Sequence, residues 1–209
     1  MATQTFGTTS ITVDPSWTNV VVRMSGGADS SLIAYMVAKT IIDNDLSTRI
    51  TRMTHNLENF PNTNSINTQT AADAQAQITS LLGVDVFTSA SHEKTYGSDA
   101  LKTDDLLVWL NSITTDCFFD GTTMNPPVSM ENVVIGSALT ERDTAFVNYP
   151  DYKYSFGSVA KDVVVQLYHD LGIVSLYQST TSCISAYDVV PCNECWWCKE
   201  REWADAKVT

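Results

Sequence analysis

The stretch Val20–Ser31 constrains the fold more than any other part of this chain. It begins with an apolar, β-branched run, passes through two adjacent glycines, and leads into a segment with the hydrophobic spacing of a helix. Glycine has no Cβ, so its backbone amides can approach an anion closely, and the amino end of a helix directs more amides to the same point. The stretch therefore predicts a strand, an anion-binding turn and a helix. No lysine follows the glycines, so this is not the GxxxxGK[ST] loop of common NTPases.

The rest of the chain alternates short apolar segments with longer helical ones. Strands are expected at Thr9–Val13, Val20–Met24, Arg49–Thr54, Val84–Phe87, Asp116–Thr123 and Asn132–Gly136. Helices are expected from Ser30 to Asp43 and over residues 68–82, 98–113, 158–171 and 200–206, with loops at 58–67 and 137–157. This alternation indicates βαβ units and an α/β fold, a doubly wound, mostly parallel five-stranded sheet in a single domain, 1–209.

Ligands of such a sheet bind where the strands reach their carboxyl ends. We therefore expect Ser25–Ser30 and Asp120–Thr122 to lie around one crevice. His55, placed just past the expected second strand, should lie there as well.

Charge and hydropathy exclude several classes of partner. The chain carries 24 acidic and 12 basic residues, a formal net charge of −12, and no cluster of lysine and arginine, so direct binding of a nucleic acid is not expected. No apolar run reaches the roughly 18 residues that a membrane span needs, and the first ten residues lack the pattern of a secretory signal. We therefore expect a cytoplasmic protein that acts on a small molecule.

Four of the five cysteines lie close together near the end of the chain. Cys183, Cys192, Cys195 and Cys198 follow the spacing C-x8-C-x2-C-x2-C. In a reducing compartment such a cluster indicates a metal rather than disulfides, and four thiolates fill the coordination sphere of a structural Zn²⁺. The alternative is a set of buried free thiols. Cys117 stands apart in an apolar stretch and is expected to be a core thiol.

The loop Ser25–Ser30, SGGADS, resembles the PP-loop of the N-type ATP pyrophosphatases. That superfamily cuts ATP between its α and β phosphates, producing an adenylated intermediate and pyrophosphate. Glycine amides and serine hydroxyls can hold the departing pyrophosphate, and Asp29 is a plausible ligand of Mg²⁺. The resemblance implies ATP and Mg²⁺ as cofactors, Asp29 and Ser30 as catalytic residues, and a nucleotide site made of Met24, Ser25, Gly26, Gly27, Ala28, Asp29, Ser30, Ser31 and His55.

Two further segments narrow the resemblance to the 7-cyano-7-deazaguanine synthases. Like this chain, these enzymes carry SGGxDS near the start and a cysteine motif near the end. Phe156–Lys161 looks like a segment that precedes their cysteines. The resemblance implies a Rossmann-like, adenine nucleotide alpha hydrolase-like fold, a homodimer, and Lys161 as a catalytic residue that neutralises phosphates or the adenylate. Its alternative is a solvated lysine on a surface helix.

The family converts 7-carboxy-7-deazaguanine, ammonia and ATP into the nitrile used for queuosine and related 7-deazaguanines. The middle of this chain departs from the family pattern, because Gly136–Asp143 and Tyr149–Asp151 are separated by extra residues. Three alternatives therefore stay open: amidation of another small acid, thiolation of a nucleobase, possibly in RNA, and a non-catalytic nucleotide-binding module. A sulfonucleotide reductase shares the fold but needs a redox-active cysteine.

Overall fold

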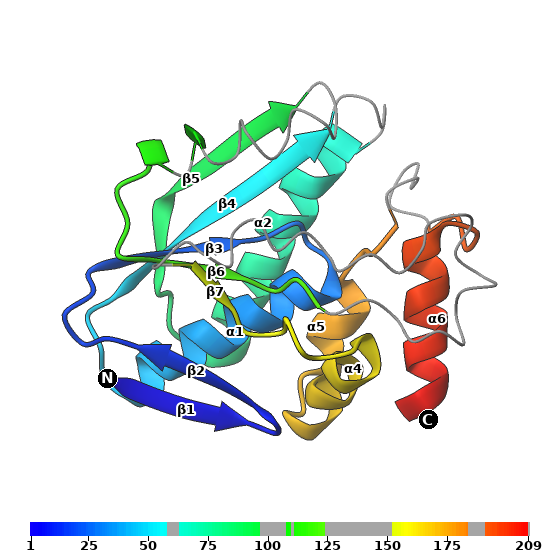
Figure 1. The fold of residues 1–209 in the computed structure, drawn as a ribbon, viewed down its shortest axis with the longest axis horizontal. Coiled ribbons are helices and arrows are strands. Elements are labelled where there is room, and N and C mark those ends of the chain that lie inside the picture. Colours follow the sequence, from blue (N-terminus) through cyan, green and yellow to red (C-terminus); the bar gives the residue numbers. More distant parts are fainter. Residues whose placement is uncertain (58–62, 97–107, 110, 124–151, 184–190, 209) are drawn as a thin grey trace.

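A computed structural model describes residues 1–57, 63–96, 108–109, 111–123, 152–183 and 191–208. Within these ranges the main sheet has the order β5-β4-β3-β6-β7, and each neighbouring pair is parallel (Figure 1). Its strands are β3 (Asn19–Arg23), β4 (Arg49–Leu57), β5 (Phe87–Tyr96), β6 (Cys117–Asp120) and β7 (Tyr152–Tyr154). An antiparallel hairpin of β1 (Ala2–Phe6) and β2 (Thr9–Val13) stands apart from it.

The strand order reverses beside β3. From β3 the chain moves outward to β4 and β5, and it then crosses to the other side of β3 to form β6 and β7. In open α/β sheets this kind of reversal creates a crevice at the carboxyl ends of the two strands where the directions part. The topology therefore predicts a ligand site at the carboxyl ends of β3 and β6.

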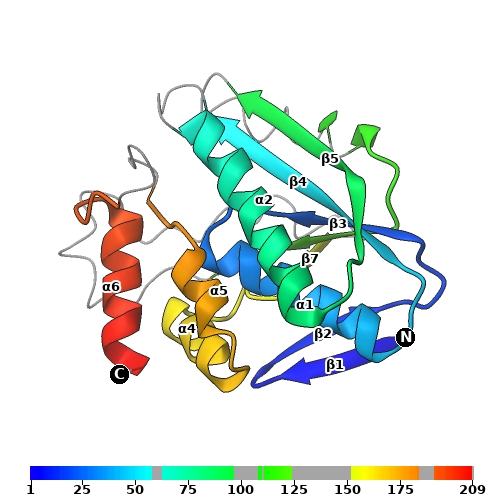
Figure 2. The same cartoon turned by 180° about the vertical axis from the view of Figure 1, so that it is seen from behind.

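Helices pack on the sheet and on one another. The described helices are α1 (Ala28–Asp43), α2 (Thr63–Leu82), α4 (Lys161–Asp170), α5 (Val174–Ser179) and α6 (Trp196–Val208). Helices α1 and α2 contact each other, and α2 crosses the face of the sheet that is turned to the viewer in Figure 2. Helix α4 contacts α1, α5 and α6, which places the carboxyl-terminal helix at the edge of the molecule (Figure 1).

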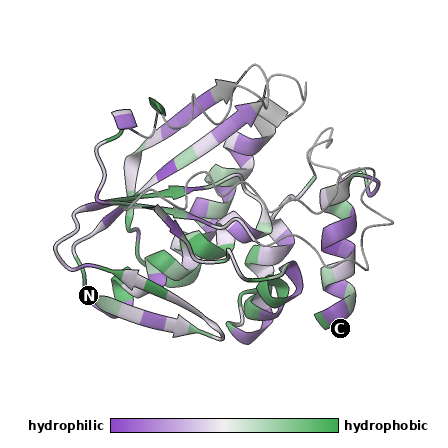
Figure 3. Cartoon of the chain, in the orientation of Figure 1, coloured by the Kyte–Doolittle hydropathy of each residue, from purple (hydrophilic) through white to green (hydrophobic). Residues whose placement is uncertain are grey.

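The core forms around β3 and α1. Val20, Val21 and Val22 are fully buried, and α1 is buried over most of its surface because the sheet, the hairpin and α4 all pack against it. Full burial of one such apolar side chain contributes about 1.5–3 kcal/mol. Figure 3 shows hydrophobic residues along β3 and mainly hydrophilic ones along α6. The helix that carries the glycine loop is thus anchored on every side.

Much of the expected architecture is confirmed. The fold is α/β with a parallel five-stranded sheet, the strand predicted at Val20–Met24 is central, and α1 follows it directly. Gly83 and Gly172 end α2 and α4 with φ of 71° and 67°, the left-handed conformation that glycine adopts after a helix. Cys117 is buried, as expected. None of the helices in the described ranges is long and apolar enough to cross a membrane.

Several element boundaries were wrong. The second strand of the sheet, β4, continues to Leu57, so His55 lies inside it instead of just beyond it. The third strand is Phe87–Tyr96, beginning where the expected one ended. Helix α2 starts at Thr63, within the expected loop 58–67.

The carboxyl-terminal half holds further differences. Strand β7 occupies the end of the expected loop 137–157, α6 begins at Trp196 instead of Glu200, and α5 was not expected. The strand expected at Asn132–Gly136 and most of the helix expected over 98–113 lie outside the described residues.

Candidate functional site

A tight loop joins β3 to α1 at the carboxyl edge of the sheet. Gly27 is the N-cap residue of α1, and no side chain caps this helix end. The Ser30 hydroxyl donates to the Gly27 carbonyl at 3.0 Å and accepts from the Ser25 amide at 3.1 Å, and the two serine hydroxyls are 3.2 Å apart. The loop is therefore fixed by its own serines, and the amino end of α1 is not covered by a capping side chain.

Gly26 needs its missing side chain. Its φ is 77°, and a Cβ at this position would lie 2.3 Å from the Thr70 hydroxyl oxygen. Thr70, on α2, donates to the Ser25 carbonyl at 3.1 Å, and the Thr181 amide donates to the Gly26 carbonyl at 3.0 Å. The loop is thus held by two elements that are distant in sequence.

The end of β6 lies directly against the start of α1. A Cβ on Gly121 would lie 2.5 Å from the carbonyl oxygen of Asp29. Before it, Asp120 is buried, accepts hydrogen bonds from the amide and hydroxyl of Thr122, and forms a 2.8 Å ion pair with Arg23 at the end of β3. Ser25–Ser30 and Asp120–Thr122 are therefore neighbours, as expected, and a crevice between them stays a prediction.

Lys161 reaches the loop from α4. It is the first residue of that helix, its side chain is 5% exposed, and its ammonium group pairs with Asp29 Oδ2 in the first turn of α1. Glu200 Oε2, on α6, lies 3.8 Å from the same nitrogen. The alternative of a solvated surface lysine is excluded by this burial.

Asp29 has one unused acceptor. Its Oδ1 is buried and accepts no hydrogen bond from the described part of the chain. The Tyr168 hydroxyl donates to the carbonyl of the preceding residue, Ala28, at 2.6 Å, and burial raises the pKa of this phenol well above its usual range. Tyr168 therefore stays neutral. The free carboxylate oxygen of Asp29 suits a Mg²⁺ ion, because this ion prefers oxygen ligands.

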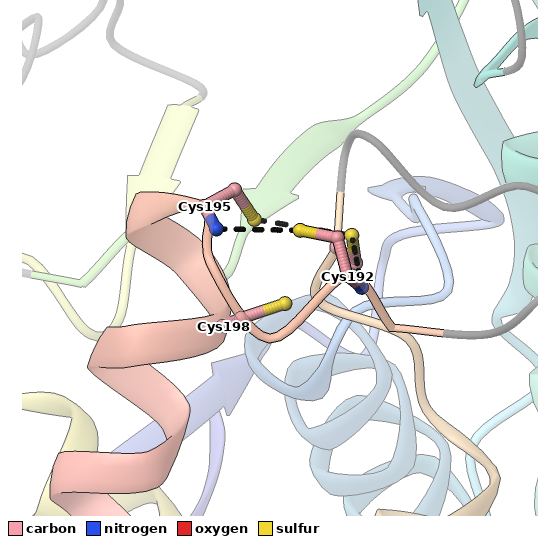
Figure 4. Close-up of side chains that lie close together, drawn as sticks. Cys192, Cys195 and Cys198 are labelled. Atoms are coloured by element: carbon pink, nitrogen blue, oxygen red, sulfur yellow. Dashed lines mark hydrogen bonds between the residues drawn. The ribbon is translucent and has the colours of Figure 1, made fainter.

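The four clustered cysteines converge as expected. Figure 4 shows Cys192, Cys195 and Cys198 turned toward one another, and with Cys183 their sulfur atoms all lie within 4.8 Å. A tetrahedral zinc with bonds of about 2.3 Å requires sulfurs roughly 3.8 Å apart. The Cys183 and Cys195 sulfurs are 3.8 Å apart. A [4Fe–4S] cluster binds each thiolate to a different iron, which demands wider spacing. The donor set therefore fits one tetrahedral ion.

The thiols of this cluster differ in acidity. Backbone amides of Glu194 and Cys195 lower the pKa of Cys192 to about 6, whereas burial raises the pKa of Cys198. A metal needs all four as thiolates, so its uptake must release the Cys198 proton, and metal binding weakens as the pH falls.

Arg201, at the end of the cysteine segment (residues 181–201), contacts the residues that come just before that segment. Its guanidinium donates to the carbonyls of Thr180 and Tyr177 at 2.8 and 2.9 Å and lies over the Tyr177 ring at 4.1 Å. Thr180 directly precedes Thr181, which bonds to Gly26. The segment that approaches the metal site thus also supports the glycine turn.

The structure brings most of the expected residues together. Ser25, Gly26, Gly27, Asp29 and Ser30 lie in one loop, and Lys161 contacts this loop through Asp29. Met24 and Ser31 are fully buried, and their place in the nucleotide site stays a prediction. His55 is buried in β4, its ring centroid 5.3 Å from that of Trp109, and its role beside an adenine stays a prediction.

Sequence reasoning missed three groups of residues. They are the loop supports Thr70, Tyr168 and Thr181, the residue Arg23, which pairs with the expected Asp120, and the charged residues Glu200 and Arg201. Only the last group left a signal, because Glu200 and Arg201 carry opposite charges two and three residues after the final cysteine of a metal motif.

Comparisons with known proteins add little. No protein-family model matches the sequence, and a search of curated proteins finds no match. Among solved structures, the chain is similar to the U34-tRNA thiolase NcsA from Methanococcus maripaludis with its [4Fe-4S] cluster, with 12% identity and a TM-score of 0.45. The match covers 90% of this chain and 64% of that one. A likeness this remote bears on neither the substrate nor the metal.

Proposed function

We propose that the protein binds ATP at the Ser25–Ser30 loop and cleaves it between the α and β phosphates, transferring the adenylyl group to a carboxylate. The observation that carries this proposal is the convergence of three features on one point. These are the amino end of α1 without a side-chain cap, the buried cation Lys161, and the carboxylate Asp29. They lie where the strand order of the sheet reverses.

Each group has a distinct task. Loop amides and the serine hydroxyls hold the β and γ phosphates, which leave as pyrophosphate. The ammonium group of Lys161 stabilises the charge that develops on the leaving group. Mg²⁺ would neutralise charge on the phosphates, and the free oxygen of Asp29 is the group that would hold it.

For the acceptor we propose 7-carboxy-7-deazaguanine, on the strength of the sequence motifs. Its carboxylate attacks the α phosphorus, ammonia displaces AMP to give the amide, and a second adenylation of the amide oxygen followed by loss of AMP gives the nitrile. Both carboxylate oxygens thus leave on AMP. We further propose that the cysteine cluster holds one structural Zn²⁺, since its sulfur spacing fits a single tetrahedral ion.

The test is a reaction with defined products. Purified protein with ATP, Mg²⁺, ammonia and 7-carboxy-7-deazaguanine should give AMP, pyrophosphate and the nitrile. Unchanged acid in a metal-loaded sample would reject this acceptor. Pyrophosphate release with another acid or a nucleobase would keep the adenylation and change the acceptor, and ATP binding without turnover would favour a nucleotide-binding module.

Gly121→Ala should weaken ATP binding at least about tenfold, or ~1.4 kcal/mol. The new Cβ would lie 2.5 Å from the Asp29 carbonyl oxygen and 2.7 Å from its carbon, both backbone atoms that move only if the start of α1 moves. Titration calorimetry with Mg–ATP measures the effect. The control is Gly83→Ala, which strains a residue with φ of 71° at the far end of α2 and should lower stability without changing affinity. Equal affinities for Gly121→Ala and the native protein would contradict the assigned loop.

A further inference from the structure

Lys161 lies between two carboxylates that come from different elements. Asp29 belongs to the glycine loop and its side chain is 20% exposed, whereas Glu200 belongs to α6 and its side chain is 1% exposed. Glu200 follows Cys198 by two residues, so the helix that begins in the cysteine motif carries a buried carboxylate to the lysine of the phosphate site.

Electrostatics makes this arrangement unusual. A lysine in the first turn of a helix opposes the helix dipole, so Lys161 needs negative partners to remain buried and charged. Two carboxylates face one ammonium group beside a loop that would receive a triphosphate. Neutralising one of these carboxylates would therefore favour the binding of ATP. Asp29 is the one with an unused oxygen for Mg²⁺ and with partial exposure.

We propose that Glu200 is a positioning residue. When Asp29 binds Mg²⁺ and no longer pairs with Lys161, Glu200 would hold the ammonium group of Lys161 near the loop. Lys161 could then pair with a phosphate in place of Asp29. This inference rests on the proposed ATP cleavage. The Glu200–Lys161 pair would then be a second contact between the cysteine segment and the site. The first is the hydrogen bond from the Thr181 amide to the Gly26 carbonyl.

The test compares four proteins: native, Glu200→Gln, Lys161→Met and the double variant. Glutamine keeps the size of the side chain and removes its charge. Glu200→Gln should lower kcat for pyrophosphate release by about ten- to a hundredfold, because displacing a catalytic group by about 1 Å costs up to that much. The KM for ATP should change little, because removing a negative charge favours ATP binding and offsets the misplaced lysine. In the Lys161→Met background the substitution should have no further effect on kcat.

A matched control is available on the same helix. Glu202→Gln makes the same change of charge at a side chain that is 70% exposed and pairs with Lys199. It should leave kcat and KM unchanged. The metal content of every variant, measured by mass spectrometry, should equal that of the native protein, which separates an effect on Lys161 from loss of the ion.

Unfolding by denaturant provides a readout that needs no turnover. Each variant changes the unfolding equilibrium constant by some factor relative to the native protein. If Lys161 and Glu200 stabilise each other, the factors of the two single variants multiplied together should exceed the factor of the double variant by about tenfold. Additive shifts, an unchanged kcat in Glu200→Gln, or an equal loss of kcat with and without Lys161 would each overturn the inference. Absence of pyrophosphate release by the native protein would instead overturn the proposed function.

Discussion

Lys161→Met is expected to lower the rate of pyrophosphate release by about 10²- to 10³-fold, the usual cost of removing one donor that stabilises developing charge. The lysine is the cation that the structure places directly at the glycine loop, where its ammonium group pairs with Asp29. The measurement is single-turnover release of pyrophosphate at saturating ATP, which separates the chemical step from binding.

Loss of stability has to be separated from loss of catalysis. Removing Lys161 leaves the carboxylates of Asp29 and Glu200 without this cation, and breaking such a buried pair costs about 3 kcal/mol or more. The variant Lys161→Met/Glu200→Gln neutralises one of them and should regain part of the stability while remaining inactive. Lys199→Met, at a surface pair with Glu202, should keep both properties. A folded Lys161→Met protein with native release would refute the role of this lysine.

The glycine loop could be predicted because its signals are local. A β-branched run, two glycines and an amphipathic segment follow one another within twenty residues, so β3, the turn and α1 were recognised from Val20 onward. The cysteine cluster was predictable for the same reason, because its spacing is itself the signal. Gly26 and Gly121 differ in this respect, since only the structure shows which atoms crowd each glycine.

Strand β5 was missed because its sequence is polar. Within the described residues Phe87–Tyr96 forms the edge of the sheet and pairs with β4 alone, and residues 88–94 are half-buried or exposed. An exposed edge strand needs no apolar alternation, so the short segment Val84–Phe87 gave the stronger signal. His55 was misplaced by a related error, because β4 continues through polar residues as far as Leu57.

The partners of Lys161 could not be predicted from any window of sequence. Asp29 lies 132 positions before it and Glu200 lies 39 positions after it. They meet because the topology brings the amino ends of α1 and α4 together and because α6 packs on α4. The sequence supplied only the residue types, and the packing of the helices decided which charges became neighbours.

Removal of the metal should have the second large effect, because the cysteine segment supports the site at two places. At its start Thr181 donates a hydrogen bond to the Gly26 carbonyl, and near its end Glu200 faces Lys161. Cys198→Ser, or treatment with a strong chelator, should therefore abolish pyrophosphate release. It should also lower the free energy of unfolding by at least about 3 kcal/mol, a small share of the 10–16 kcal/mol with which structural zinc binds to finger peptides.

Calorimetry and metal analysis test this together. The native protein should contain one zinc per chain and show no visible absorption, whereas a [4Fe–4S] cluster would give four irons and a brown colour. Cys117→Ala is the matched control, because Cys117 is buried but lies outside the cluster. It should lower stability modestly and leave the metal content unchanged. If the metal-free protein kept its native stability and released pyrophosphate normally, the cysteine segment would be an appendage that does not support the loop.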